Sequence, residues 1–105
     1  MLDYSFEVEI AADAERDFYN QVAWLEENRS IAIADQFEAD FEALTERLSV
    51  NPYQWQKVMI YGRVARRAII QSRYILLYQV IEKEKRVVVL RVRGAAEDWT
   101  NQPLP

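Results

Sequence analysis

The chain has 105 residues, half of them hydrophobic, which is enough for one packed domain over residues 1–105 and too few for two. It contains neither cysteine nor histidine, which excludes disulfides, thiolate metal sites and the side chain most often used as general base or metal ligand. The net charge of −4 conceals an uneven distribution: residues 1–50 hold thirteen acids and three bases, whereas residues 51–105 hold four acids and ten bases. We therefore expect one acidic and one basic surface, although acidic solvated helix faces would produce the same division.

No segment has the pattern of a targeting or membrane sequence. The N-terminal residues Met1 to Tyr4 lack a basic region followed by an apolar run, so no signal peptide is predicted. No apolar run approaches the roughly 20 residues that cross a bilayer. Because the absence of cysteine also suits a reducing compartment, the sequence predicts a cytoplasmic protein without membrane contact.

The N-terminal half predicts one strand and two helices. Alternating apolar and polar residues predict a half-buried strand over residues 4–10. Helical spacing predicts a first helix over residues 13–28 with Asp13 as N-cap, and a second over residues 31–48 capped by Ser30. The short connection predicts an antiparallel helical hairpin. The apolar stripe of the second helix is Ile33, Phe37, Phe41, Leu44 and Leu48.

The C-terminal half predicts three strands, over residues 64–70, 74–81 and 86–93, after an irregular segment over 52–62. The strand over 74–81 is apolar on both faces, so we expect it inside the sheet. The fold class is therefore α+β in the order β-α-α-β-β-β, with a helical hairpin on one face of a mainly antiparallel four-stranded sheet. The residues expected in the core are Phe18, Phe37, Phe41, Leu44, Leu76, Tyr78 and Leu90.

Arg66 and Arg67 are candidates for partner contact. They are adjacent on a predicted strand, so their side chains point to opposite faces of the sheet. One interpretation is contact with an acidic partner, and the other is an edge strand protected by charge.

Arg91 and Arg93 are two residues apart and therefore share one face of their predicted strand. If the helices cover the face of Val88, Leu90 and Val92, the two arginines lie on the open face. They would then act as partner contacts or remain solvated charges.

The other conspicuous side chains are interpreted as structural. Trp24 is expected to pack in the helical hairpin, Trp55 over an end of the core, and Trp99 against the C-terminus, although aromatic residues also stack on nucleic acids. Glu97 and Asp98 are an unconvincing acid/base couple because adjacent residues rarely converge on one substrate. No catalytic residue, metal ligand or cofactor is predicted.

Four pieces of the C-terminal half occur in a recognisable order: an Arg-led strand over 66–70, a Tyr-x-x-x-Tyr-x-Val strand over 74–80, a Val-rich strand over 87–92, and a closing acid, Asp98. Together with the pair at 51–52 after the second helix, they resemble the RelE/ParE superfamily of toxins, also described as plasmid stabilisation proteins. The resemblance covers residues 4–99.

The sequence departs from the ribonuclease branch of that superfamily. An arginine typically follows the first tyrosine of the central strand, where this chain has Ile75, and another follows the last strand, where it has Gly94, Ala95 and Ala96. Many ParE-like members end in a His-x-Arg-Arg-Asp pattern, of which only Asp98 is kept. Phosphodiester cleavage needs cations at the developing charge, so we interpret the ribonuclease site as absent.

The resemblance implies the toxin of a type II toxin–antitoxin system, ParE-like, acting by binding a target such as DNA gyrase. A cognate antitoxin would neutralise it, and oligomers are expected only in complex with that antitoxin. The alternatives are a ribosome-dependent mRNA endonuclease and a non-toxic, degenerate interaction module. The net acidity argues against direct nucleic-acid binding. We expect the partner to place acids near Arg66, Arg67, Arg91 and Arg93, and bases or apolar residues along the second helix.

Overall fold

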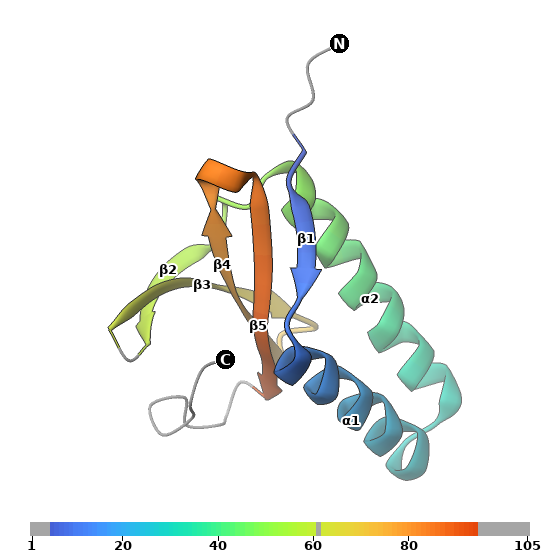
Figure 1. The fold of residues 1–105 in the computed structure, drawn as a ribbon. Helices are drawn as coiled ribbons and strands as arrows, with labels where there is room; N and C mark the ends of the chain where they lie inside the picture. Colours follow the sequence, from blue (N-terminus) through green and yellow to red (C-terminus); the bar gives the residue numbers. More distant parts are fainter. Residues whose placement is uncertain (1–4, 61, 95–105) are drawn as a thin grey trace.

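Two helices pack on one five-stranded sheet in the computed structural model, which describes residues 5–60 and 62–94 (Figure 1). The order confirms the predicted α+β class, with one strand more than expected. The elements are β1 Glu7–Ile10, α1 Ala12–Asn28, α2 Ile31–Val50, β2 Gln56–Ile60, β3 Arg63–Ile70, β4 Tyr74–Ile81, a 3-10 turn Glu82–Glu84, and β5 Arg86–Gly94.

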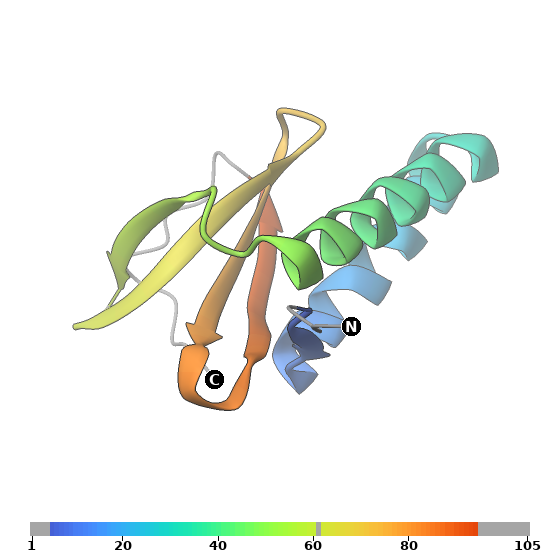
Figure 2. The same ribbon diagram turned by 90° about the horizontal axis from the view of Figure 1, so that it is seen from above.

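The sheet has the order β1-β5-β4-β3-β2, which confirms β4 as an interior strand. Among the described residues, β1 and β5 pair in parallel, and the pairings of β2 with β3, β3 with β4 and β4 with β5 are antiparallel. Both helices lie on one side of the sheet, while the β2–β3 hairpin extends away from them (Figure 2). The N-terminal strand therefore lies beside the last one, and the helices leave the β2 end of the sheet uncovered.

The additional strand is β2, in the segment expected to be irregular. β2 pairs with residues 63–67 of β3, and the turn between the two strands contains Gly62, which has a φ of +77°. Because β2 lies outside β3, Arg66 and Arg67 do not lie on an edge strand. The interpretation of this pair as charged protection of a sheet edge is wrong.

The helix starts differ in how they are capped. Ser30 caps α2 as predicted, since its Oγ accepts a hydrogen bond from the Ile33 amide at 3.1 Å. The N-cap of α1 is Ala11, which makes no side-chain hydrogen bond, so the predicted Asp13 cap is wrong. Asp13 instead lies in the first turn and pairs with Arg16 at 3.0 Å.

The core lies between the helices and the central strands. Of the predicted core residues, Phe37, Leu44, Leu76, Tyr78 and Leu90 are buried, and Phe18 and Phe41 are half-buried and pack against the core. Ile33 is an exception to the predicted apolar stripe because it is exposed and Ala34 is buried in its place.

β5 does not present the face that its simple alternation predicted. Val87 and Val89 belong to the helix-facing core together with Val92. The odd spacing arises because a register shift in the pairing with β4 leaves Leu90 without a partner residue. The helices therefore cover Val87 and Val89 before the register shift and Val92 after it, so the predicted assignment of faces is wrong for Val88 and correct for Val92.

The tryptophans have different environments. Trp55 is half-buried and packs against the core, as predicted. Trp24 is 52% exposed on α1, so its predicted role in hairpin packing is wrong. Trp99, like the acid pair at 97–98, lies outside the described residues.

Candidate partner-binding site

Arg91 is buried and bound within the chain. Arg91 as a whole residue is 9% exposed. Its Nε donates to Asp17 Oδ2 at 2.8 Å, and its Nη2 donates to Asp17 Oδ1 at 3.1 Å. Asp17 Oδ2 also accepts a hydrogen bond from the Val92 amide at 3.0 Å. Asp17 thus occupies the edge of β5 where β1 has ended. Arg91 has the face opposite Val92, as predicted, but it is buried against α1 and is not exposed on an open surface.

Arg93, the second arginine of that pair, is half-buried at the end of β5. It lines a cavity of about 330 Å³ together with Asn20, Trp24 and Gly94. The cavity lies between α1 and β5, so Arg93 is also near the helices rather than far from them.

Arg66 holds the segment that leads into β2. Its Nη1 donates to the carbonyls of Tyr53 at 3.1 Å and Trp55 at 2.7 Å, and its guanidinium lies 5.3 Å from the Tyr53 ring centroid. Next to it, the Tyr78 hydroxyl donates to the Pro52 carbonyl at 2.6 Å. Burial raises the pKa of Tyr78 to about 12, so this hydroxyl stays protonated as a donor. Arg66 and Tyr78 together fix residues 52–55 on the sheet.

Arg67 points to the opposite face and is exposed. Strand alternation places Arg63 on the same face, where its Nη2 donates to Gln79 Oε1 at 3.0 Å. The basic surface of the sheet is therefore centred on Arg67 and Arg63. The four predicted arginines do not form one cluster.

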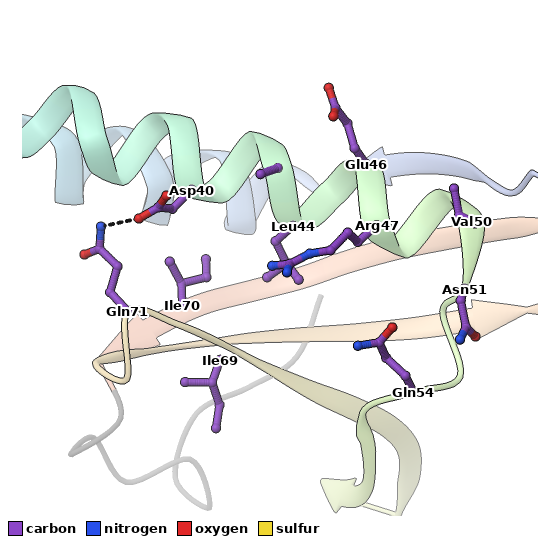
Figure 3. A pocket seen from close by; sticks show the side chains of 11 residues that line it. Asp40, Leu44, Glu46, Arg47, Val50, Asn51, Gln54, Ile69, Ile70 and Gln71 are labelled. Carbon is purple, nitrogen blue, oxygen red and sulfur yellow. Dashed lines mark hydrogen bonds between the residues drawn. The ribbon is translucent and has the colours of Figure 1, made fainter.

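A groove of about 700 Å³ separates α2 from the end of β3 (Figure 3). Leu44 and Ile70 are buried at its base. Val50, which is 72% exposed, and Ile69, which is 41% exposed, supply apolar surface at its rim.

The charges around this groove have both signs. Gln71 Nε2 donates to Asp40 Oδ2 at 2.8 Å and bridges the β3–β4 turn to α2. Figure 3 shows the Arg47 side chain directed into the groove and Glu46 directed away from it. The groove offers apolar surface but no consistent charge that would select a partner.

The central strand β4 carries no arginine or lysine. Ile75, at the position where the ribonuclease branch has an arginine, is 5% exposed and pairs with Ile69 and Arg93. Within residues 5–60 and 62–94, no three Asp or Glu side chains lie close enough to hold a metal ion. Neither helix in this part of the chain has the length and apolar character needed to span a membrane.

A family model for the ParE toxin of the type II toxin–antitoxin system, parDE, matches residues 8–99. The chain belongs to this family. The match confirms the superfamily that the C-terminal motifs indicated. No curated protein matches the chain.

Two solved structures share the fold of this ParE family member. The chromosomal ParDE TA system from P. aeruginosa aligns with a TM-score of 0.71 and 13% identity, covering 88% of this chain and 98% of that one. The toxin–antitoxin complex RelBE2 from Mycobacterium tuberculosis aligns with a TM-score of 0.64 and 22% identity, covering 89% and 94%. At these identities the likeness concerns the fold.

Sequence reasoning missed Asp17, Arg63 and the groove between α2 and β3. Residues four apart on a strand share one face of the sheet, so the predicted strand, extended by one residue to Arg63, would have placed Arg63 on the face of Arg67. No local signal links Asp17 to Arg91, because the pair is separated by 74 residues.

Proposed function

We propose that this ParE family member is a cytoplasmic toxin that acts by binding and blocking a large target such as DNA gyrase, and that a cognate antitoxin neutralises it. The observation that carries the proposal is the family match over residues 8–99. The buried Ile75 on the central strand supports a binding mechanism over RNA cleavage, because it brings no cation to the sheet. The acidic net charge supports a protein target over a nucleic acid.

Arg67, which is exposed on the helix-free face, makes the main electrostatic contact with partners. Arg66, Arg91 and Arg93 are buried or half-buried, and the first two donate hydrogen bonds within the chain. Their contribution to partner contact is expected to be smaller, because engaging a partner would cost these internal bonds.

The test is induced expression followed by assays with purified protein. We expect growth arrest with a DNA-damage response, inhibition of DNA supercoiling by gyrase, and relief on co-expression of the small open reading frame beside the gene. Messenger RNA in the arrested cells and on purified ribosomes should remain intact. Site-specific cleavage of ribosome-bound mRNA would replace the proposal with the endonuclease alternative. Normal growth with stable antitoxin binding would replace it with the non-toxic interaction module.

A further inference from the structure

A group of buried apolar side chains lies outside the core that the helices cover. Each of its members is at most 5% exposed: Ala65, Ile75, Leu77 and Leu90. None of them belongs to the cluster between the helices and the sheet. On β4, Ile75 and Leu77 alternate with Leu76 and Tyr78, which do belong to that cluster, so the first two point to the helix-free face. The helix-free face of β4 is therefore both apolar and buried.

The exposure of this face falls sharply from β3 to β4. Ile69 on β3 is 41% exposed, whereas Ile75, which pairs with it on β4, is 5% exposed. The pair formed by Arg67 and Leu77 shows the same contrast, because Arg67 is exposed and Leu77 is 2% exposed. Cross-strand neighbours lie beside a side chain rather than over it, and both helices lie on the other side of the sheet (Figure 2). The burial of Ile75 and Leu77 therefore requires a cover over β4 that stops short of β3.

The C-terminal segment, residues 95–105, starts next to these two side chains. Gly94, the last described residue, pairs with Tyr74, which directly precedes Ile75. Eleven residues follow Gly94 in the sequence. An extended chain of this length spans roughly 35 Å at about 3.3 Å per residue, and neighbouring strands are only about 4.8 Å apart. The C-terminal segment is therefore long enough to cross from β5 over β4.

The composition of the C-terminal segment suits this face of the sheet. Trp99 and Leu104 supply large apolar side chains, Glu97 and Asp98 supply two acids, and the segment contains no basic residue. The strands β2 to β5 contain no Asp or Glu, and their helix-free face presents Arg67. Opposite charges attract the segment to the sheet, and an indole ring is large enough to shield several aliphatic side chains from water.

We propose that the C-terminal segment folds back over the helix-free face as a strap, in which the Trp99 ring covers Ile75 and Leu77. The strap removes apolar surface from water, which provides hydrophobic free energy for its docking. Its acids add long-range attraction to the basic sheet without reaching over β3, so Arg67 stays exposed. The inference concerns contacts within one chain and holds whether or not the protein inhibits gyrase.

The first test uses thiol reactivity, because the chain contains no cysteine. A maleimide should modify Leu77→Cys at least roughly tenfold more slowly than Ile69→Cys in the folded, full-length chain. Adding Trp99→Ser with Leu104→Ser should raise the rate at Leu77→Cys several-fold. Adding Trp24→Ser, which removes a tryptophan exposed on α1, is the matched control and should leave the rate unchanged.

Leu76→Cys reports whether the substitutions in the strap open the whole fold. Leu76 is 0% exposed on the helix-covered face, so its thiol should stay unreactive when Trp99 and Leu104 are replaced. Acceleration at Leu77→Cys alone supports the strap. An unchanged rate at Leu77→Cys would overturn it. Equal acceleration at both positions would also overturn it, because the segment would then stabilise the whole domain instead of covering one face.

The second test uses the unmodified chain. Nuclear Overhauser contacts should join the indole protons of Trp99 to the methyl groups of Ile75 and Leu77. Contacts of the indole with other side chains only, or with none, would overturn the inference. Contacts that appear only as the protein concentration rises would assign the cover to a second copy and overturn it as well. None of these outcomes depends on toxicity, so the proposed function would stand in each case.

Discussion

Asp17 and Arg91 form a two-point ion pair that joins α1 to β5, with N–O distances of 2.8 and 3.1 Å. The side chains of the two residues are 13% and 11% exposed. The same carboxylate accepts the Val92 amide, a backbone donor that would otherwise face an unpaired strand edge. One aspartate therefore satisfies both a buried guanidinium and the sheet edge that β1 is too short to cover.

Asp17→Ala should lower the free energy of unfolding by about 3 kcal/mol, because it leaves the buried Arg91 guanidinium without its carboxylate. Asp13→Ala is the control, since it removes a more exposed pair with Arg16 on the same helix and should cost less than about 1 kcal/mol. Urea denaturation followed by circular dichroism measures both. Equal losses in the two variants would show that the buried pair contributes nothing beyond an ordinary surface contact.

The helices and the interior strand could be predicted because their signals are local. The apolar residues of α2 recur at helical spacing, and Ser30 supplies a cap next to them in sequence. β4 is apolar on both faces, which only a strand between two others accommodates. Each inference depended on residues within one element.

The errors arose where long-range pairing overrides local pattern. Residues 56–60 have weak alternation and become β2 only through pairing with β3. In β5, a register shift around Leu90 reverses the alternation, which no composition signal reveals. Arg91 keeps the face opposite Val92 because it pairs with Leu77, but its side chain is buried against Asp17 of α1, which no local pattern indicates.

The candidate binding surfaces were predictable only in part. The charge division correctly suggested an acidic second helix, on which Glu38 and Glu42 are exposed. The cavity lined by Val8, Phe18 and Phe41 combines a strand with two helices, and the groove between α2 and β3 combines residues from distant segments. Such concave surfaces exist only after the elements have been placed.

Tyr78→Phe should destabilise the fold by about 1–2 kcal/mol, because the buried Pro52 carbonyl loses the hydroxyl that donates to it at 2.6 Å. The control is Tyr74→Phe, whose hydroxyl accepts a hydrogen bond from Gln21 at a partly buried position and should matter less. Thermal and urea unfolding of both variants provide the comparison. A larger loss in the Tyr74 variant would contradict the assigned importance of the Pro52 contact.

The stability of the wild type should also fall at high pH. Burial raises the pKa of Tyr78 from 10.0 to about 12, so the unfolded chain loses this proton first. The contribution of the neutral hydroxyl is complete below pH 10 and is lost as pH rises toward 12, by at most about 1.4 kcal/mol per pH unit. The difference in unfolding free energy between wild type and Tyr78→Phe should therefore shrink over this range. A constant difference would exclude the linkage.

Ser72→Gly should stabilise the protein by roughly 0.5–1 kcal/mol. Gln71 and Ser72 connect β3 to β4 with φ angles of 55° and 56°, a left-handed conformation that glycine adopts without steric cost. Ser49→Gly is the control, because the same substitution within helix α2 should destabilise. A rise in Tm for the first variant and a fall for the second is the expected result. A fall in both would mean that the turn gains nothing from glycine.

Arg67→Glu should slow association with the antitoxin several-fold and flatten its salt dependence, with little change in dissociation. Arg67 is exposed on the same helix-free face as Arg63, so it contributes to long-range attraction of an acidic partner more than to a buried contact. Arg29→Glu at the tip of the helical hairpin is the control for the change in net charge.

Arg91→Glu would instead break the pair with Asp17, so its effect on binding would be inseparable from unfolding. Association rates measured from low to high salt, first with the product of the adjacent open reading frame and then with gyrase, separate the two partners. Identical rates and salt slopes in wild type and Arg67→Glu for both partners would mean that this arginine is a solvated charge, and the helix-free face would lose its assignment as the electrostatic contact.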